Sequence, residues 1–127
     1  MKKLHEEWFD YARDDLAFAK AGLRDGFFSH VCVLSQQAVE KAMKGYLVYQ
    51  DKSYPKDHGL IRLLKLMQVD WLDEHIGTLK KLSEYYVPLK YPDAAGALRG
   101  VFPDKKLAES SLNSAKGIVG LIESKTS

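Results

Sequence analysis

Apolar residues recur three and four positions apart along most of this chain, which is the pattern of amphipathic helices. In the first segment, acidic and basic residues lie between the apolar ones and form a side that faces solvent. A helix stop follows at Asp25-Gly26, because glycine readily adopts the left-handed conformation that ends a helix. The pattern predicts a first helix whose apolar face is formed by Leu4, Trp8, Tyr11, Ala12, Leu16, Ala19 and Leu23.

A second helix is predicted from about Phe27 to Tyr49, and the short connection makes it an antiparallel neighbour of the first. Residues 27–34 and 46–49 are apolar around nearly the whole helix, so both ends are expected in the centre of a bundle. Residues 36–44 between them read Gln-Gln-Ala-Val-Glu-Lys-Ala-Met-Lys. Polar groups in such a helix need partners, from neighbouring helices or from a ligand.

Three further helices are expected in the rest of the chain. The third is short and follows the break at Pro55, which lacks a backbone donor. Residues 88–103 form the least regular segment, with three prolines and two glycines. The expected helices run from an N-cap at Asp57 to Met67, from an N-cap near Asp70 to just before Pro88, and from Pro103-Asp104 through Ile122.

No segment alternates apolar and polar residues as a half-buried strand does, and no stretch repeats at a fixed period. The sequence therefore predicts an all-α fold, an up-and-down helical bundle of about five helices. Its 127 residues suffice for one domain, residues 1–127, without metal or disulfide support.

Charge and cysteine content narrow the class of protein. Nineteen basic against seventeen acidic residues give a formal charge of +2 without a block of like charges, so no extended nucleic-acid-binding surface is expected. A local phosphate site remains open. Cys32 is the single cysteine, which excludes an internal disulfide, favours a reducing compartment and is expected to be buried. No signal peptide or membrane span is evident, so we expect a cytoplasmic protein.

The second helix carries the strongest candidate site. Gln37, Lys41 and Lys44 share one face, at spacings of four and three, while Gln36 and Glu40 lie on the adjacent one. One interpretation is a structural ion pair from Glu40 to Lys44, with the glutamines bonding neighbouring helices. The other is a binding site in which the lysines meet phosphate and the glutamines read polar edges.

Two other groups of residues are weaker candidates. His58 is predicted at the start of the third helix, where free backbone donors can help to hold an anion, and Arg62 follows one turn later. Aromatic and charged residues in the irregular segment could stack on a base or equally form an oligomer contact. These are Tyr85, Tyr86, Lys90, Tyr91 and Asp93. The histidines are scattered and no metal motif is present, so no metal or other cofactor is expected.

The run from Ser35 to Val48, then Pro55 to Leu60 and Lys90-Tyr91-Pro92-Asp93, resembles the HEPN domain, the higher eukaryotes and prokaryotes nucleotide-binding domain. The resemblance covers nearly the whole chain, including Trp8. It implies a bundle of about five helices, homodimers or larger oligomers, and a minimal nucleotidyltransferase encoded nearby.

The resemblance also implies two functional classes. Some HEPN proteins are ribonuclease toxins with an arginine, four to six residues and a histidine in the later half of the domain. Here only Arg24 and His30 have that spacing, and they lie in the first inter-helix connection. We therefore expect no catalytic residue of this kind.

The sequence favours a nucleotide- or phosphate-binding module that oligomerises and associates with a minimal nucleotidyltransferase, as in a toxin-antitoxin pair. A metal-independent ribonuclease toxin and a purely oligomeric scaffold are the alternatives. The predicted ligand-binding residues are Gln37, Glu40, Lys41, Lys44, His58, Arg62, Lys90, Tyr91 and Asp93.

Overall fold

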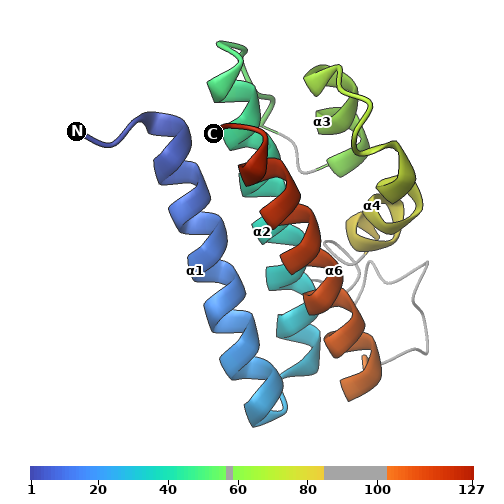
Figure 1. Ribbon diagram of the computed structural model, residues 1–127. Coiled ribbons are helices and arrows are strands. Elements are labelled where there is room, and N and C mark those ends of the chain that lie inside the picture. The colour runs from blue at the N-terminus through green and yellow to red at the C-terminus, as the bar shows by residue number, and fades with distance from the viewer. Residues whose placement is uncertain (57–58, 85–102) are drawn as a thin grey trace.

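The computed structural model describes residues 1–56, 59–84 and 103–127 and is helical almost throughout this part of the chain (Figure 1). No strand is present among these residues, which confirms the predicted all-α class. None of the described helices has the length and apolar character that crossing a bilayer requires. The helices are α1 (Leu4–Asp25), α2 (Phe28–Tyr49), α3 (Leu60–Met67), α4 (Ile76–Ser83) and α6 (Lys105–Ser124), with a 3-10 turn η1 (Asp73–His75) before α4.

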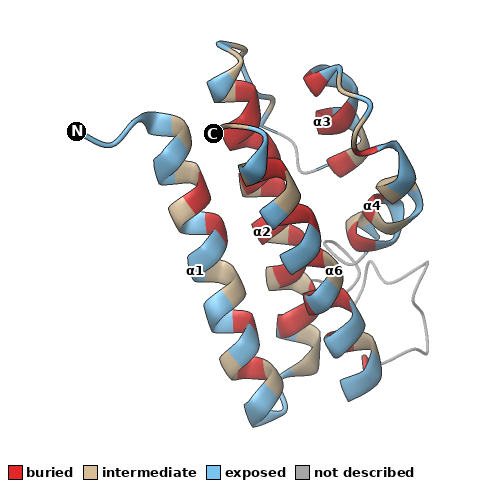
Figure 2. Ribbon diagram, viewed as in Figure 1, coloured by how far each residue is buried: buried red, intermediate tan, exposed pale blue. Residues whose placement is uncertain are grey.

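Helix α2 is the centre of the bundle. It runs antiparallel to α1, α6 lies along both of them, and α3 and α4 pack against another side of α2 (Figure 1). Thirteen of its 22 residues are buried, whereas α1, of equal length, buries four (Figure 2). The predicted central position of this helix is therefore confirmed. The expectation that both of its apolar ends are buried is wrong, because its buried residues lie between Val31 and Leu47 while Phe27 and Tyr49 are exposed.

The ends of the long helices follow local sequence signals. Gly26 has a φ of 88°, and the next amide, of Phe27, donates to the Gly22 carbonyl at 2.8 Å, which closes the last turn of α1. At the start of α6 the Asp104 carboxylate accepts from the Leu107 amide at 2.8 Å. Both ends lie where the sequence predicted them.

Helix α3 begins later than predicted. Gly59 occupies its N-cap position, so the predicted cap at Asp57, which lies outside the described residues, is wrong. The first amide of α3 is satisfied from another element, because the Leu60 N–H donates to Ser83 Oγ at 3.2 Å, at the end of α4. This tertiary contact replaces the local cap that the sequence suggested.

The other end of α3 is closed by the connection that follows α2. Gln68 adopts a left-handed conformation, with a φ of 55°, and ends the helix. The carbonyl of Met67 accepts from Gln50 Nε2 at 2.9 Å, and the carbonyl of Leu66 accepts from Lys52 Nζ at 3.0 Å. A lysine at a helix C-terminus also suits the negative end of the helix dipole.

The fourth helix is shorter than the sequence predicted. The Asp73 amide donates to the Asp70 carbonyl at 3.0 Å, and the His75 amide donates to the Leu72 carbonyl at 2.9 Å. These bonds span three residues and form a tight 3-10 turn, so the predicted start at Asp70 is wrong and α4 begins at Ile76. The turn brings Trp71 edge-on against Tyr46, with ring centroids 5.3 Å apart.

Helix α1 is less buried than its apolar pattern suggested. Leu4 and Tyr11, both predicted on its buried face, are exposed, while Phe9 is buried instead. Since α1 packs on α2 and α6 and lies at the side of the bundle, its neighbours cover only a narrow stripe. Leu16 and Leu23 on this helix are partly buried and pack against the core.

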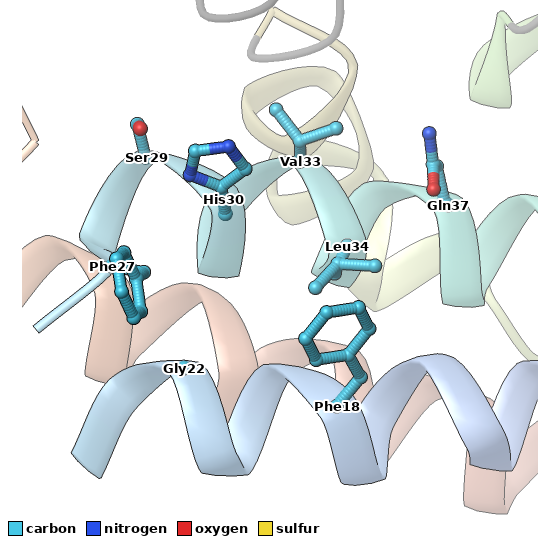
Figure 3. A pocket seen from close by; sticks show the side chains of 8 residues that line it. All are labelled: Phe18, Gly22, Phe27, Ser29, His30, Val33, Leu34 and Gln37. Atoms are coloured by element: carbon cyan, nitrogen blue, oxygen red, sulfur yellow. The ribbon is translucent and has the colours of Figure 1, made fainter. Parts of the chain in front are cut away.

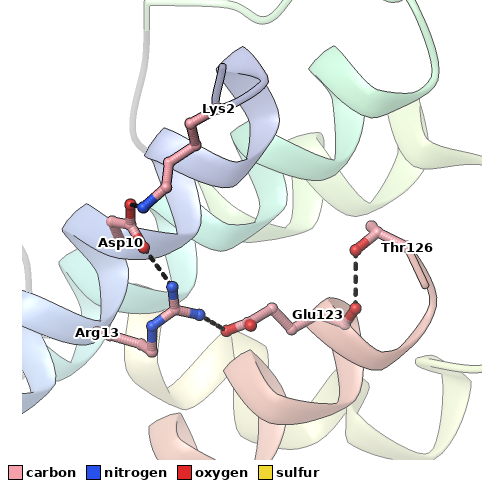
Figure 4. Close-up of polar contacts among 5 residues, drawn as sticks. All are labelled: Lys2, Asp10, Arg13, Glu123 and Thr126. Atoms are coloured by element: carbon pink, nitrogen blue, oxygen red, sulfur yellow. Dashed lines mark hydrogen bonds and ion pairs between the residues drawn. The ribbon is translucent and has the colours of Figure 1, made fainter.

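Charged side chains connect the two termini (Figure 4). Arg13 in α1 pairs with Asp10 and with Glu123 near the end of α6, and Lys2 also pairs with Asp10. The hydrogen bond from Lys2 lowers the pKa of the Asp10 carboxyl. Because these side chains are well exposed, water and salt screen them and their contribution to stability is small.

Helices α1 and α2 approach each other closely at Gly45. A Cβ atom on this glycine would lie 2.7 Å from Trp8 Cβ and 3.1 Å from Phe9 Cε1. Trp8 Cβ is attached directly to the backbone, so only a movement of the whole helix would make room. The contact therefore sets the separation of the two helices.

We predict that Gly45→Ala destabilises the protein by about 1 to 3 kcal/mol, because the added methyl group overpacks the α1–α2 contact. Chemical denaturation measures the effect. Gly117→Ala in α6 is the matched control, since nothing lies within 4 Å of its added Cβ. This variant should gain up to about 1 kcal/mol from helix propensity. Equal effects of the two substitutions would contradict the close contact.

Candidate functional site

The polar residues of α2 form a buried ladder along one side of the helix. Gln36, Glu40 and Lys44 follow one another at intervals of four residues, so their side chains stack on successive turns. Lys44 Nζ lies 2.8 Å from Glu40 Oε2, and Gln36 Nε2 donates to Glu40 Oε1 at 3.4 Å. All three residues are buried.

The Glu40–Lys44 pair is almost removed from water. The Lys44 side chain is 8% exposed and the Glu40 side chain 9%. At such burial an ion pair gives little net stability over an apolar pair, but removing one partner leaves an uncompensated charge in the protein. The ion pair of the structural interpretation is therefore present, and a bound phosphate would have to separate Lys44 from its carboxylate.

Lys41 points toward α1 instead. Its Nζ lies 2.7 Å from Asp15 Oδ2, and it is 5.9 Å from the centroid of the exposed Tyr11 ring. The Lys41 side chain is 31% exposed. Although the spacing places both lysines on one side of α2, each has its own carboxylate, and only Lys41 is substantially open to solvent.

The Tyr54 ring lies near the buried Lys44 ammonium group, and Trp8 packs against Tyr54. Lys44 Nζ is 5.8 Å from the centroid of the Tyr54 ring, and Tyr54 meets Trp8 edge-on with centroids 5.2 Å apart. These distances lie at the outer range of cation-π attraction. The rings connect the end of α2, the following loop and α1 close to the ion pair.

An open groove lies between α1 and the N-terminal half of α2 (Figure 3). Its volume is about 580 Å³. Phe18 and Phe27 stand at its sides, and Gln37 is the predicted site residue that lines it. The full lining consists of Phe18, Gly22, Phe27, Ser29, His30, Val33, Leu34 and Gln37.

The remaining predicted site residues are not brought into this groove by the described structure. Arg62 is exposed on α3. His58, Lys90, Tyr91 and Asp93 lie outside the described residues, as do Tyr85 and Tyr86. Their role in ligand binding stays a prediction.

The arginine and histidine with ribonuclease-like spacing are placed by the turn from α1 to α2. Arg24 lies in the last turn of α1 and contacts Asp25 at 3.4 Å. His30 is exposed in the first turn of α2, where it lines the groove beside Phe27. Both side chains lie on the surface near the connection between α1 and α2.

Among the described residues, no group of three or more histidine, cysteine, aspartate or glutamate side chains could hold a metal ion. Cys32 is fully buried, as predicted, and burial raises the pKa of its thiol. It contributes to packing between α2 and α6 rather than to reactivity.

Asp15 and Phe18 are residues that the sequence analysis missed. Asp15 lies on α1 opposite Lys41, and no spacing within one helix reveals a pair between two helices. Phe18 had a detectable signal, because it is a large aromatic residue outside the apolar stripe of the first helix. Such a position predicts either a contact or an exposed ring.

Comparison with known proteins agrees with this architecture. The sequence matches the HEPN domain over residues 5–125, so the chain belongs to the HEPN family. No curated protein gave a significant match.

Two solved structures are similar over nearly their whole length. TT1696 from Thermus thermophilus has a TM-score of 0.84 and 29% sequence identity, and the alignment covers 95% of this chain and 97% of that one. ST0689, an archaeal HEPN homologue, has a TM-score of 0.80 and 26% identity, with 99% and 100% covered. These matches confirm the fold that the sequence predicted.

Substitution of Lys44 in the Glu40–Lys44 pair should change the stability of the protein more than substitution of Lys41 in the Asp15–Lys41 pair. We predict that Lys44→Met costs about 2 to 4 kcal/mol of unfolding free energy, because the Glu40 charge stays buried without its ammonium partner. Lys41→Met is the comparison variant in the same helix and should cost less, because the Lys41 side chain is 31% exposed, although that of its partner Asp15 is only 13% exposed. Denaturant titrations of the two variants compare them.

A second substitution identifies the cause of the loss. Adding Glu40→Gln to Lys44→Met removes the uncompensated carboxylate and should recover part of the stability. If the single Lys44 variant is no less stable than the Lys41 variant, the Glu40–Lys44 pair does not contribute as a buried ion pair.

Proposed function

We propose that this HEPN protein is a nucleotide- or phosphate-binding module that forms homo-oligomers and acts with a separately encoded minimal nucleotidyltransferase. The observation that supports binding is the position of Lys41. Its partly exposed ammonium group lies beside the exposed Tyr11 ring, and Gln37, one turn earlier on α2, lines the neighbouring groove. A cation, an aromatic ring and an amide are protein groups that can bind the phosphate and the base of a nucleotide.

Lys41 is better suited to this role than Lys44. A phosphate that approaches Lys41 competes with Asp15 for the ammonium group, and Lys41 is the more exposed of the two lysines, at 31% against 8% for Lys44. A phosphate that approaches Lys44 would have to break a pair buried in the protein. We therefore assign the direct contact to Lys41 and a supporting role to the Glu40–Lys44 pair.

Calorimetric titration with ATP in low salt tests the binding proposal. Wild type should bind, and Lys41→Ala should bind several-fold to about tenfold more weakly, because one charge-assisted contact to phosphate is lost. Lys116→Ala is the matched control, since Lys116 is an exposed lysine on α6. Loss of thermal stability without loss of affinity in Lys41→Ala would assign α2 to packing alone.

The proposal also holds that the protein does not cleave RNA by itself. Its one arginine-histidine pair of the required spacing, Arg24 and His30, lies on the exposed surface at the α1–α2 connection. Purified protein should leave structured and unstructured RNA intact in the absence of its partner. Cleavage that disappears in His30→Ala or His58→Ala would establish the ribonuclease alternative and identify the general base.

Membership of the HEPN family supports the proposed nucleotidyltransferase partner, which is a protein outside this chain. A nucleotidyltransferase gene in the adjacent reading frame, whose product copurifies with this protein, is the expected finding. Copurification should persist in Lys41→Ala if the partner and the nucleotide occupy different surfaces.

A further inference from the structure

We infer that the groove between α3 and α4, called the α3–α4 groove below, is a binding site for a small amphipathic anion, that is, an apolar chain or ring with one carboxylate. The groove lies on a different side of α2 from Lys41, because α3 and α4 pack together there while Lys41 points toward α1 (Figure 1). The inference therefore goes beyond the proposed nucleotide or phosphate site and is independent of it.

The floor of the α3–α4 groove is apolar. Ile61 and Leu64 come from one face of α3, Ile76 begins α4, and Val69 lies in the connection between the two helices. Ile61, Val69 and Ile76 are only partly buried, so each packs against the core with one side and lines the groove with another. Covering such a surface with an apolar ligand removes it from water and is therefore favourable.

Two lysines line the same groove, one from each helix. Lys65 comes from α3 and Lys80 from α4, and both are exposed. Within the described part of the chain, neither forms an ion pair with a carboxylate. They differ in this respect from Lys41 and Lys44, which each have a carboxylate partner. An anionic group in the groove can therefore contact either ammonium group without first separating an ion pair.

The other two polar residues of the lining set its charge and order one of its sides. Gln68 Oε1 accepts a hydrogen bond from Lys52 Nζ at 3.2 Å, so a cation outside the groove holds this amide in place. Asp73 is the one acidic residue among those that line the groove, and with two lysines the lining has a formal charge of +1. This charge complements an anion and disfavours a cation.

The size of the groove suits a small molecule better than a folded partner. Its volume is about 580 Å³, within the range of about 300 to 1,000 Å³ that is typical of small-molecule sites. A stable protein interface uses about 20 to 30 residues on each side. Helices α3 and α4 have eight residues each, and only part of each helix lines the groove.

Titration of the isotope-labelled full chain with decanoate, followed by NMR, tests the inference. Saturable shifts of backbone amide signals should appear on α3, on α4 and at Val69 between them. Hexanoate has four methylene groups fewer and should bind at least tenfold more weakly, because each buried methylene group contributes about fourfold in affinity. Decyltrimethylammonium has the same chain length and the opposite charge, and it should bind at least several-fold more weakly than decanoate.

Substitutions in the lining test the contribution of charge. Lys65→Ala and Lys80→Ala should each weaken decanoate binding several-fold, whereas Asp73→Asn should strengthen it because a repelling carboxylate is removed. Lys81→Ala is the matched control, since Lys81 is the exposed lysine next to Lys80 and does not line the groove. It should leave the affinity unchanged. Circular dichroism checks that all variants retain their helices.

Three results would overturn the inference: no saturable shifts on α3 and α4, equal affinities of Lys80→Ala and Lys81→Ala for decanoate, or equal affinities of wild type for decanoate and decyltrimethylammonium. Displacement of decanoate by ATP would also overturn it, because the two ligands would then share one site.

The Lys41→Ala variant separates this inference from the proposed function. It should bind decanoate as wild type does while its affinity for ATP falls. Decanoate binding by a wild type that does not bind ATP supports the α3–α4 site and refutes the proposed nucleotide binding. ATP binding by a wild type that does not bind decanoate refutes the α3–α4 site alone.

Discussion

Trp8 and Gly45 meet where α1 crosses α2, and the contact leaves no space for a Cβ atom on the glycine. The rest of the bundle depends on this close approach. It brings Asp15 within reach of Lys41 and, further along the same helix pair, places Phe18 beside Leu34. A wider separation of α1 and α2 would break the Lys41–Asp15 ion pair and open the groove. The absence of a side chain at Gly45 therefore determines how the two helices face each other.

Helix α2 has two roles that compete for the same residues. As the central helix it must be buried on most sides, yet it carries two glutamines, a glutamate and two lysines in a nine-residue stretch. The protein meets both demands by pairing charges at intervals of one helical turn and across to α1. A buried pair adds little net stability but penalises any arrangement that separates it, so it favours one packing of α2.

The described surfaces divide between a polar and an apolar region on one side of the molecule. Lys41 and Tyr11 lie along the α1–α2 pair beyond the groove between Phe18 and Phe27, whose lining contains no charged side chain. Gln37 lies between the two regions.

The helices themselves could be predicted from sequence because their signals are local. Periodicity identified α1, α2 and α6, while Gly26 and Asp104 marked boundaries through hydrogen bonds within a few residues. The prediction failed where distant groups satisfied the backbone. Ser83 binds the first amide of α3, and Gln50 and Lys52 bind its last carbonyls, so no local cap was needed.

The candidate site could likewise be predicted from the sequence only in part. The sequence by itself indicated the Glu40–Lys44 pair as one interpretation, because residues four apart in a helix lie next to each other. It did not predict that Gln36 bonds Glu40 on the same helix, since the glutamines were expected to bond neighbouring helices. Only the tertiary structure decided that Lys44 is buried, that Lys41 meets Asp15 on α1, and that Phe18 and Phe27 stand exposed beside one groove. Burial and pairing between helices depend on which faces come together, and that is determined by the packing of the whole bundle.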